Sequence, residues 1–285
     1  MRIREHHEVF KEMKHQISVV INYCTNDYQF IRHTVKAVAP FASEIIIPVS
    51  DHFYDGSPEN YSLLKKTKRE NSEATFIDLE FDPTLKEQHI WWWKLRRILR
   101  LSVQSGSQFW ICYARYRGYS SVSNKRGYVL FLDADEVIDT KRFIHWLNGR
   151  QYKNLYGMKF SNYWYFRRPI YQATTIEDSP VMVRNGTLSY DSFFSYSERQ
   201  GIYEKLEPPK KRMILGLDGM PMVHHFGWVR SKKNMLKKVR TWGHNREVDW
   251  KTLVEKEFTH EFNGKDFVQG YSFRTVKPFI SFPDR

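Results

Sequence analysis

The sequence predicts an α/β fold in which a sheet is flanked by helices, organised as a single domain with a C-terminal elaboration. Short apolar runs rich in β-branched residues alternate with segments of helical periodicity. The first two runs enclose a helical segment within about 35 residues, which is the length of a βαβ unit. A chain of 285 residues with 41% hydrophobic side chains can also bury a large core.

The N-terminal part is expected to be a right-handed βαβ unit. Residues 16–21 and 44–49 (QISVVI and EIIIPV) have the composition of buried strands. Apolar residues recur at helical spacing over 31–38, where Asp27 is placed to cap the helix and Pro40 to end it. The crossover between two parallel strands is almost always right-handed.

The next segment predicts a third strand at 74–81 and a helix at about 84–101. The helix would carry Trp91, Trp92 and Trp93, which cannot all share one face, so core packing is favoured over stacking on a ligand.

A fourth strand is expected at 128–132, and acids follow it directly. Asp133, Asp135 and Glu136 would lie at its carboxyl end, where open α/β sheets bind ligands. Carboxylates two residues apart repel each other unless a cation lies between them, and Mg²⁺ or Mn²⁺ prefers such oxygen ligands. The alternative is an acidic turn that caps the helix starting at Thr140.

The segment LDADE resembles the metal-binding DxD motif of nucleotide-sugar-dependent glycosyltransferases with the GT-A (Rossmann-like, mixed-sheet) fold, in particular family-2-like enzymes and those that build lipopolysaccharide core. The family also tends to carry A-R-N-x-G in the preceding helix. Here Ala114, Arg115 and Gly118 match, whereas Tyr116 replaces the asparagine. The resemblance implies that Arg115 lies near the diphosphate or braces Asp133.

The resemblance also implies a general base downstream of the DxD motif. An inverting transferase needs a carboxylate within about 3 Å of the acceptor hydroxyl. Glu177 and Asp178 form an acidic pair before Arg184, and Glu198 has the spacing of a glutamate in the lipopolysaccharide-core enzymes. We favour Glu198 over Asp178.

A late strand at 220–226 carries His224 and His225, and alternation allows only one of them to face the site. Ser231 then caps a helix. The resemblance implies that His225 completes a metal shell with Asp133 and Asp135. Basic residues at the start of this helix suit a pyrophosphate, because helix N-termini favour anions: Arg230, Lys232 and Lys233.

The loops after the first two strands, 22–27 and 50–56, would border the same crevice. In the resembling family they hold the nucleobase and ribose, which makes Asp51 the first candidate for the base and Asp55 the second. Both acids are also common in ordinary turns.

The function that the resemblance implies is transfer of a sugar from a UDP- or GDP-sugar to an acceptor hydroxyl, with Mn²⁺ or Mg²⁺ as cofactor and with inversion of configuration. A glycan is the favoured acceptor, and a modified nucleic-acid base is the other. The expected organisation is a basic extension at 1–15, the transferase domain at 16–245 and a packed extension at 246–285 that includes a helix near 248–258.

The net charge of +13 indicates attraction to polyanions, which include nucleotides, nucleic acid and anionic membrane surfaces. A non-catalytic nucleic-acid-binding protein and a metal-dependent nucleotidyltransferase are therefore the alternatives. The sequence has no apolar run of about 18 residues and no apolar signal-peptide core near its start, and its two cysteines, Cys24 and Cys112, lack a metal-binding spacing. A cytoplasmic location is expected.

Overall fold

The computed structural model describes residues 16–80, 82, 84–85, 106–195, 197–206, 210–245 and 247–282. The predicted extension at 1–15 lies outside the described residues, as does nearly all of the helix predicted at 84–101 with its three tryptophans.

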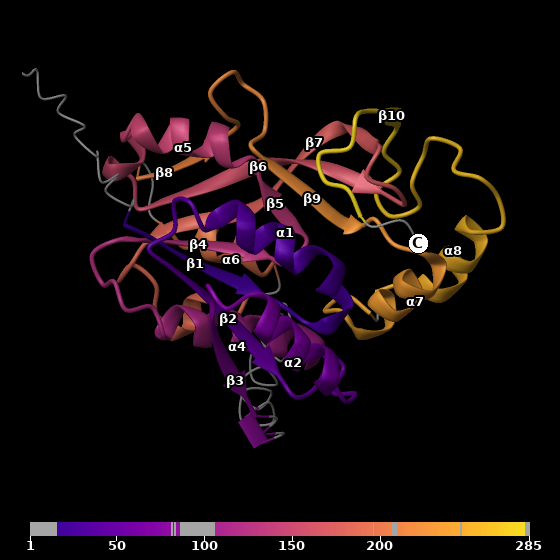
Figure 1. Ribbon diagram of the computed structural model, residues 1–285, viewed down its shortest axis with the longest axis horizontal. Helices are drawn as coiled ribbons and strands as arrows, with labels where there is room; N and C mark the ends of the chain where they lie inside the picture. The colour runs from indigo at the N-terminus through magenta and orange to yellow at the C-terminus, as the bar shows by residue number, and fades with distance from the viewer. Residues whose placement is uncertain are drawn as a thin grey trace, which may run out of the picture.

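The described strands form one mixed sheet (Figure 1). Its order is β3-β2-β1-β4-β7-β6-β9-β5, with β10 paired to β7 and β8 paired to β6. The strands β1 to β4 are parallel to their neighbours within this group, and β7 then joins β4 antiparallel. The strand bounds are β1 Ile17–Asn22, β2 Glu44–Ser50, β3 Thr75–Leu79, β4 Tyr128–Asp133, β5 Glu136–Ile138, β6 Gly157–Phe166, β7 Tyr171–Arg184, β8 Lys211–Ile214, β9 Val223–Trp228 and β10 Phe273–Thr275.

Helices cover both faces of this sheet (Figure 1). Their bounds are α1 Tyr28–Val38, α2 Tyr61–Glu70, α4 Gly106–Ser120, α5 Thr140–Asn148, α6 Arg199–Glu204, α7 Lys232–Thr241 and α8 Trp250–Glu257, with short 3₁₀ turns at Thr25–Asp27, Gln151–Asn154 and Tyr190–Ser192. The predicted α/β class, with a mixed sheet flanked by helices, is confirmed.

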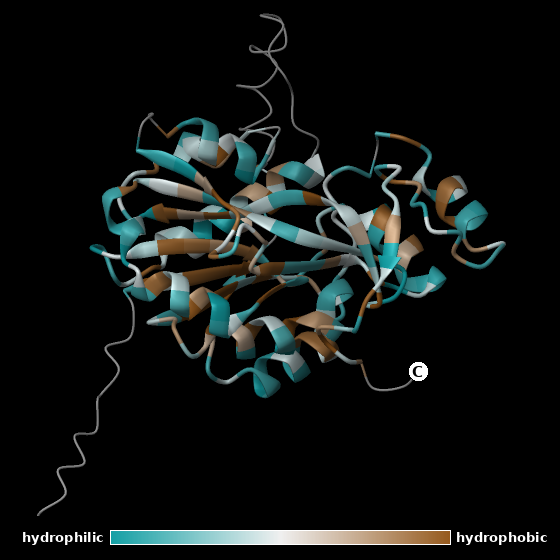
Figure 2. Cartoon of the chain, turned by 90° about the horizontal axis from the view of Figure 1, so that it is seen from above, coloured by the Kyte–Doolittle hydropathy of each residue, from teal (hydrophilic) through white to brown (hydrophobic). Residues whose placement is uncertain are grey.

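The two faces of β1 belong to different cores. Ile17, Val19 and Ile21 pack in one cluster with α1 and α5, whereas Val20 packs in a second cluster with α4. This is the period-2 alternation of a strand buried on both sides, and every residue of β1 is buried. Figure 2 shows the hydrophobic bands along these inner strands.

The C-terminal part packs on the far end of the sheet through aromatic side chains. Trp228 of β9 contacts Trp242 and Trp250, and Trp164 of β6 contacts Tyr271. Strand β10 extends the edge of β7. No helix among the described residues is long and apolar enough to cross a membrane.

Three local expectations differ from the structure. The three acids were expected together at the carboxyl end of the fourth strand; Asp133 ends β4 as expected, but Glu136 starts the short strand β5, which pairs antiparallel with β9. The strand expected from Met220 begins at Val223. Asp27 precedes α1 without capping it through its side chain, because its carboxylate is ion-paired with Arg230.

Candidate active site

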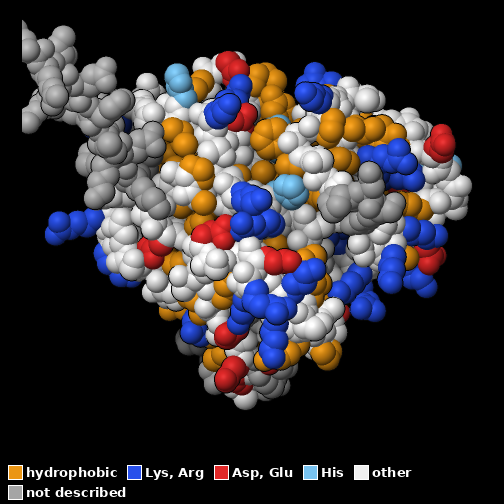
Figure 3. Space-filling model, in the orientation of Figure 1, with side chains coloured by type: hydrophobic (Ala, Val, Ile, Leu, Met, Phe, Trp, Pro, Cys, Tyr) orange, Lys and Arg blue, Asp and Glu red, His pale blue; other side chains and the backbone are white. Residues whose placement is uncertain are grey.

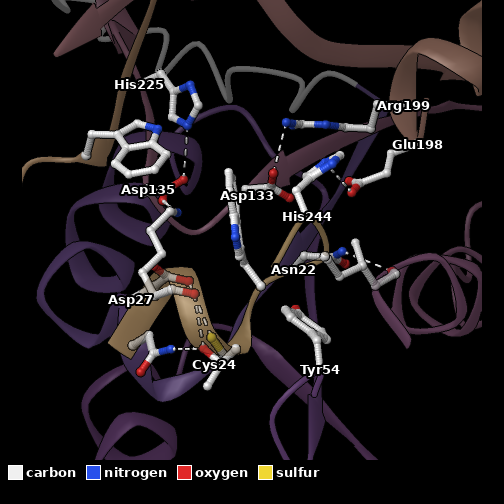
Figure 4. A pocket seen from close by; sticks show the side chains of 17 residues that line it. Asn22, Cys24, Asp27, Tyr54, Asp133, Asp135, Glu198, Arg199, His225 and His244 are labelled. Carbon is white, nitrogen blue, oxygen red and sulfur yellow. Dashed lines mark hydrogen bonds and ion pairs between the residues drawn. The ribbon is translucent and has the colours of Figure 1, made fainter. Parts of the chain in front are cut away.

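A pocket of about 240 Å³ lies at the carboxyl ends of β1 and β4 (Figure 4). The 22–27 loop and α7 form one side of it, and the start of α6 forms another. Parallel strands meet their ligands at this edge because their connecting loops diverge there. The pocket is lined by Asn22, Cys24, Asn26, Asp27, Tyr54, Ile111, Asp133, Asp135, Glu198, Arg199, His225, Trp228, Lys238, Thr241, Trp242, Gly243 and His244.

Asp133, the last residue of β4, is held between two guanidinium groups. Its Oδ1 accepts a hydrogen bond from Arg115 at 3.1 Å, and its Oδ2 accepts one from Arg199 at 2.9 Å. Burial raises the pKa of Asp133, and the charges of Arg199 and Arg115 oppose that rise. Arg115 therefore braces the first aspartate of the motif, one of the two places that the resemblance implied for it.

Asp135 faces a different group of cations. Its Oδ2 accepts from Arg230 at 3.2 Å and from Lys238 at 3.3 Å, and its Oδ1 lies 3.6 Å from Nε2 of His225. Burial alone would raise the pKa of Asp135, but Lys238, His225 and Arg230 together hold it well below its ordinary value. The second aspartate is thus ionised and partly neutralised by the protein itself.

Gly227 makes the approach of His225 to Asp135 possible. A Cβ at position 227 would lie 2.7 Å from Nε2 of His225 and 3.3 Å from Oδ2 of Asp135. Real Cβ atoms do not approach other atoms as closely as 2.7 Å, so a side chain there would displace the imidazole.

Glu136 lies beneath the pocket and is fully buried. Its carboxylate accepts hydrogen bonds from both terminal nitrogens of Arg199, from Ser179 at 2.6 Å and from the backbone N–H of Asp133 at 2.9 Å. A buried carboxylate with this many donors is satisfied, so Glu136 fixes Arg199 and the end of β4.

Glu198 precedes α6 in a strained backbone conformation, with φ 47° and ψ −116°. Its Oε1 lies 3.4 Å from Nε2 of His244, and its Oε2 lies 3.6 Å from Arg115. Burial would raise the pKa of Glu198, but the hydrogen bond from His244 and the charge of Arg115 lower it to about 2. Strain of this kind persists where the surrounding contacts impose it, and it is frequent at functional sites.

The pKa of His244 is shifted in the opposite direction. Burial would lower its pKa, but its bond to Glu198 and its contact with Glu247 raise the pKa to about 9. At neutral pH the two side chains form an ion pair at the pocket wall, as Figure 4 shows.

The pocket contains polar atoms without partners among the described residues. These buried atoms are Oδ1 of Asn22, Oδ1 of Asn26, Nδ1 of His225 and Nε1 of Trp242, and behind the pocket Nε and Nη1 of Arg115. Native proteins leave few buried polar groups unpaired, so these acceptors and donors are available to a polar ligand or to ordered water in the pocket.

Four of the sequence-predicted residues line this pocket together: Asp133, Asp135, Glu198 and His225. Arg115 and Arg230 lie behind it, both buried and both paired with its acids. The adjacent histidine, His224, faces the other side of β9 and bonds to Tyr165.

Three predicted residues lie elsewhere. Asp51 has 62% of its side chain exposed and pairs with His52. Lys233 is exposed on α7, and Asp178 pairs with Lys159 on the neighbouring strand. None of the three lines the pocket.

Sequence reasoning missed Arg199, Lys238 and His244. Lys238 could have been found, because it lies three residues after Met235 and four before Trp242. It therefore shares the helix face that these apolar residues turn toward the protein. No sequence pattern pointed to Arg199 or His244, because each contacts a partner that is distant in the sequence.

The described residues contain no group of three histidine, cysteine or acidic side chains arranged to hold a metal ion. Two of the three predicted ligands do meet, through Oδ1 of Asp135 and Nε2 of His225. Mg²⁺ is commonly held by one or two carboxylates with the remaining positions filled by substrate phosphates and water. Asp135 and His225 thus supply two donors, and a divalent ion here would take its other ligands from a phosphorylated ligand and water. Asp133 is engaged by its two arginines, and Oδ2 of Asp135 by Arg230 and Lys238.

No protein-family model matches the chain, and no curated protein matches it in sequence. Among solved structures, it is similar to the glucosyl-3-phosphoglycerate synthase of M. tuberculosis, with 14% identity, a TM-score of 0.37 and coverage of 70% of this chain and 69% of that one. It is also similar to the glycosyltransferase GlyE of Streptococcus pneumoniae, with 12% identity, a TM-score of 0.34 and coverage of 86% and 64%.

A third similar structure is the bifunctional glycosyltransferase WbbM, with 8% identity, a TM-score of 0.40 and coverage of 87% of this chain and 53% of that one. These identities and TM-scores are too low to assign the chain to a family, so the chemistry of the pocket has to identify the function.

Proposed function

We propose that the protein is a glycosyltransferase that moves a sugar from a nucleoside-diphosphate sugar to an acceptor hydroxyl, with the help of a divalent cation and with inversion at the anomeric carbon. The observation that supports this most is the pocket itself. It joins the DxD acids, His225 and Glu198 at the carboxyl ends of parallel strands, beside buried polar atoms that have no partner.

The charge balance of the site favours a ligand that arrives with its own cation. The acids of the site already have cationic partners in the protein: Asp27 and Asp135 contact Arg230, Asp133 and Glu136 contact Arg199, and Glu198 contacts Arg115 and His244. A diphosphate would bring uncompensated negative charge into a buried site, which is costly. A divalent ion bound with the diphosphate removes that cost.

We infer that Asp135 and His225 hold this ion, Mn²⁺ or Mg²⁺. When bound, it would neutralise charge on the leaving diphosphate. Lys238 and Arg199, which line the pocket from α7 and from the start of α6, supply further positive charge there. We assign contact with the nucleoside to Asn22, Asn26 and Tyr54, which line the pocket from the end of β1 and from the loops after β1 and β2.

Glu198 is the preferred general base. It is the pocket-lining acid outside the 22–27 loop and the DxD motif, whereas Asp178 is paired with Lys159 away from the pocket. In the proposed step the acceptor oxygen bonds to the anomeric carbon, the bond from that carbon to the diphosphate breaks, and the hydroxyl proton passes to Glu198. Because the pKa of Glu198 is about 2, this carboxylate is ionised but weakly basic, so we expect the proton to move late in the step.

A glycan is the favoured acceptor. The exposed Lys and Arg side chains are dispersed over several elements, as Figure 3 shows for one face, and do not follow a single groove of the kind that tracks a nucleic-acid backbone. A nucleotidyltransferase would use similar acids and cations but would release pyrophosphate, whereas sugar transfer releases a nucleoside diphosphate.

The test is a thermal unfolding scan against UDP-, GDP- and CMP-sugars, each with and without Mn²⁺. We expect metal alone and nucleotide sugar alone to stabilise weakly, and the matching pair to stabilise by about 2.7 kcal/mol at a hundredfold excess over its dissociation constant. Asp135→Asn should abolish the joint effect, whereas Asp78→Asn, an exposed acid on β3, should leave it unchanged.

If no nucleotide sugar stabilises the protein under any condition, the proposal is wrong. Stabilisation by a nucleoside triphosphate with Mn²⁺, followed by release of pyrophosphate, would instead establish the nucleotidyltransferase.

A further inference from the structure

The segment 215–222 interrupts what would otherwise be a continuous strand. Strands β8 and β9 both run parallel to β6 and lie along the same edge of it. Ile214 at the end of β8 pairs with Phe160, and Val223 at the start of β9 pairs with Asn162. The chain therefore uses eight residues, 215–222, to cover a distance of about 7 Å, which two residues of β6 span. The sheet does not need this loop to connect its strands, and Figure 1 shows the loop standing out above them.

The loop is held in one conformation by polar contacts on its inner side. Arg142 of α5 donates to both carboxylate oxygens of Asp218 and to the carbonyl of Met220 at 3.0 Å, and the N–H of Met220 donates to Asp218 at 3.1 Å. Gly216 has φ 147°, and a Cβ there would overlap the carbonyl of Met220. The charged side chain of this loop, Asp218, is thus paired with Arg142 of the same protein.

Three apolar side chains of the loop and Met213 of β8 are exposed to solvent, whereas Pro221 and Met222 at the end of the loop are buried. Met213 is 48% exposed, Leu215 42%, Leu217 50% and Met220 36%. These are four of the nine exposed large hydrophobic side chains among the described residues. Surface loops ordinarily expose polar groups, and a contiguous apolar cluster marks an interaction site. In Figure 3 hydrophobic side chains gather at the top of the molecule, over the place of this loop in Figure 1.

Basic residues are exposed at β8 and α5, the two elements that flank the loop. Lys210 and Arg212 are exposed at β8, and Lys141 and Arg150 are exposed at the two ends of α5. Helix α5 lies next to β8 and the loop in Figure 1, and Arg142 joins the helix to the loop. Apolar side chains at a tip, with cations behind them, match the layered chemistry of a membrane surface with anionic headgroups.

We propose that the exposed apolar side chains of this loop, Leu215, Leu217 and Met220, insert together with Met213 into the interfacial region of an anionic membrane, while Lys210, Arg212, Lys141 and Arg150 bind the headgroups. Such a contact would hold the protein on the membrane without any spanning segment. The inference rests on the loop alone and is independent of the proposed transferase activity.

The first experiment is flotation with vesicles of phosphatidylcholine with or without phosphatidylglycerol. The full chain should bind the anionic vesicles, and the triple variant Leu215→Ser, Leu217→Ser, Met220→Ser should bind at least about tenfold more weakly. The matched control, Tyr61→Ser with Val248→Ser, removes exposed apolar groups from other surfaces and should bind like the unaltered protein. Arg212→Gln should weaken binding by about fivefold, the effect expected for one charge near the surface.

A second measurement does not depend on how well the triple variant folds. An environment-sensitive fluorophore attached at Leu217→Cys should shift to shorter wavelength on addition of anionic vesicles, whereas the same fluorophore at Val248→Cys should not. The unaltered protein, treated with the same reagent, controls for labelling of Cys24 and Cys112. Absence of vesicle binding, or binding that is equal in the triple variant and accompanied by no shift at position 217, would overturn the proposal and favour a protein partner for this surface.

Discussion

Glu198 and His244 form an ion pair at the wall of the pocket, with Oε1 and Nε2 3.4 Å apart. Their pKa values move in opposite directions, to about 2 for the glutamate and to about 9 for the histidine. The pair links the start of α6 to the segment after α7 and so connects two walls of the site.

The first prediction concerns the pH range in which this pair stabilises the fold. The pKa of His244 is raised above its unfolded value of 6.5, so its contribution is complete below pH 6.5 and is lost as pH rises through about 9. The pKa of Glu198 is lowered, so its contribution is complete above pH 4.5 and is lost as pH falls toward 2.

His244→Asn should therefore cost most stability between about pH 4.5 and 6.5, in the order of 1–2 kcal/mol once solvent screening at this partly exposed site is allowed for. The difference from the unaltered protein should shrink above about pH 9. Denaturant unfolding across this pH range measures it, with His145→Asn on the exposed side of α5 as control. A difference that does not vary with pH would contradict the pairing.

The second prediction concerns the glycine that admits His225. Gly227→Ala places a Cβ 2.7 Å from Nε2 of His225 and should turn the imidazole away from Asp135. The joint stabilisation by Mn²⁺ and nucleotide sugar should weaken by about 10- to 100-fold in apparent affinity, while the melting temperature without ligand changes little. Gly149→Ala, at the end of α5, is the control. Unchanged metal-dependent binding in the Gly227 variant would remove His225 from the proposed metal site.

The third prediction tests whether Glu136 has a structural role in holding the site together. Glu136→Gln leaves the buried guanidinium of Arg199 with a single carboxylate, Asp133, and should destabilise the fold by about 3–5 kcal/mol. Glu70→Gln, which removes an exposed ion pair with Lys66, should cost about 0–1 kcal/mol. Equal losses in the two variants, measured by denaturant unfolding, would mean that Glu136 does not support the site.

The fourth prediction distinguishes the two acids considered as general base. Glu198→Gln should lower the rate of sugar transfer by about 100-fold or more, with donor affinity largely retained. Asp178→Asn should leave the rate within about twofold, because this acid is paired with Lys159 outside the pocket. The opposite ranking would transfer the role to Asp178.

The strands could be predicted where the local pattern allowed one interpretation. Residues 17–22, 44–50 and 128–133 are apolar runs too short for buried helices, and all three are strands in the central group. Strand β5 could not be predicted in this way. Glu136, its first residue, can be buried because its carboxylate is paired with Arg199, which is 63 residues later in the chain.

The residues of the candidate site also divide into those that the sequence predicted and those that depend on packing. Motif resemblance singled out Asp133, Asp135, Glu198 and His225, and the structure brings these four to one pocket. Asp51 was singled out because it follows β2, but that strand's end places Tyr54 at the pocket while Asp51 lies in solvent. Local sequence gives the side of the sheet on which a loop emerges, whereas the orientation of each loop residue depends on packing between elements.

The end-to-end placement of β8 and β9 along β6 also makes the 215–222 segment a natural site for engineering. A peptide tag or a small domain inserted there would enter the chain where it already leaves the sheet, so the hydrogen-bond ladders on both sides would keep their partners. Length changes at this point should therefore alter what the protein can be attached to while the pocket retains its shape.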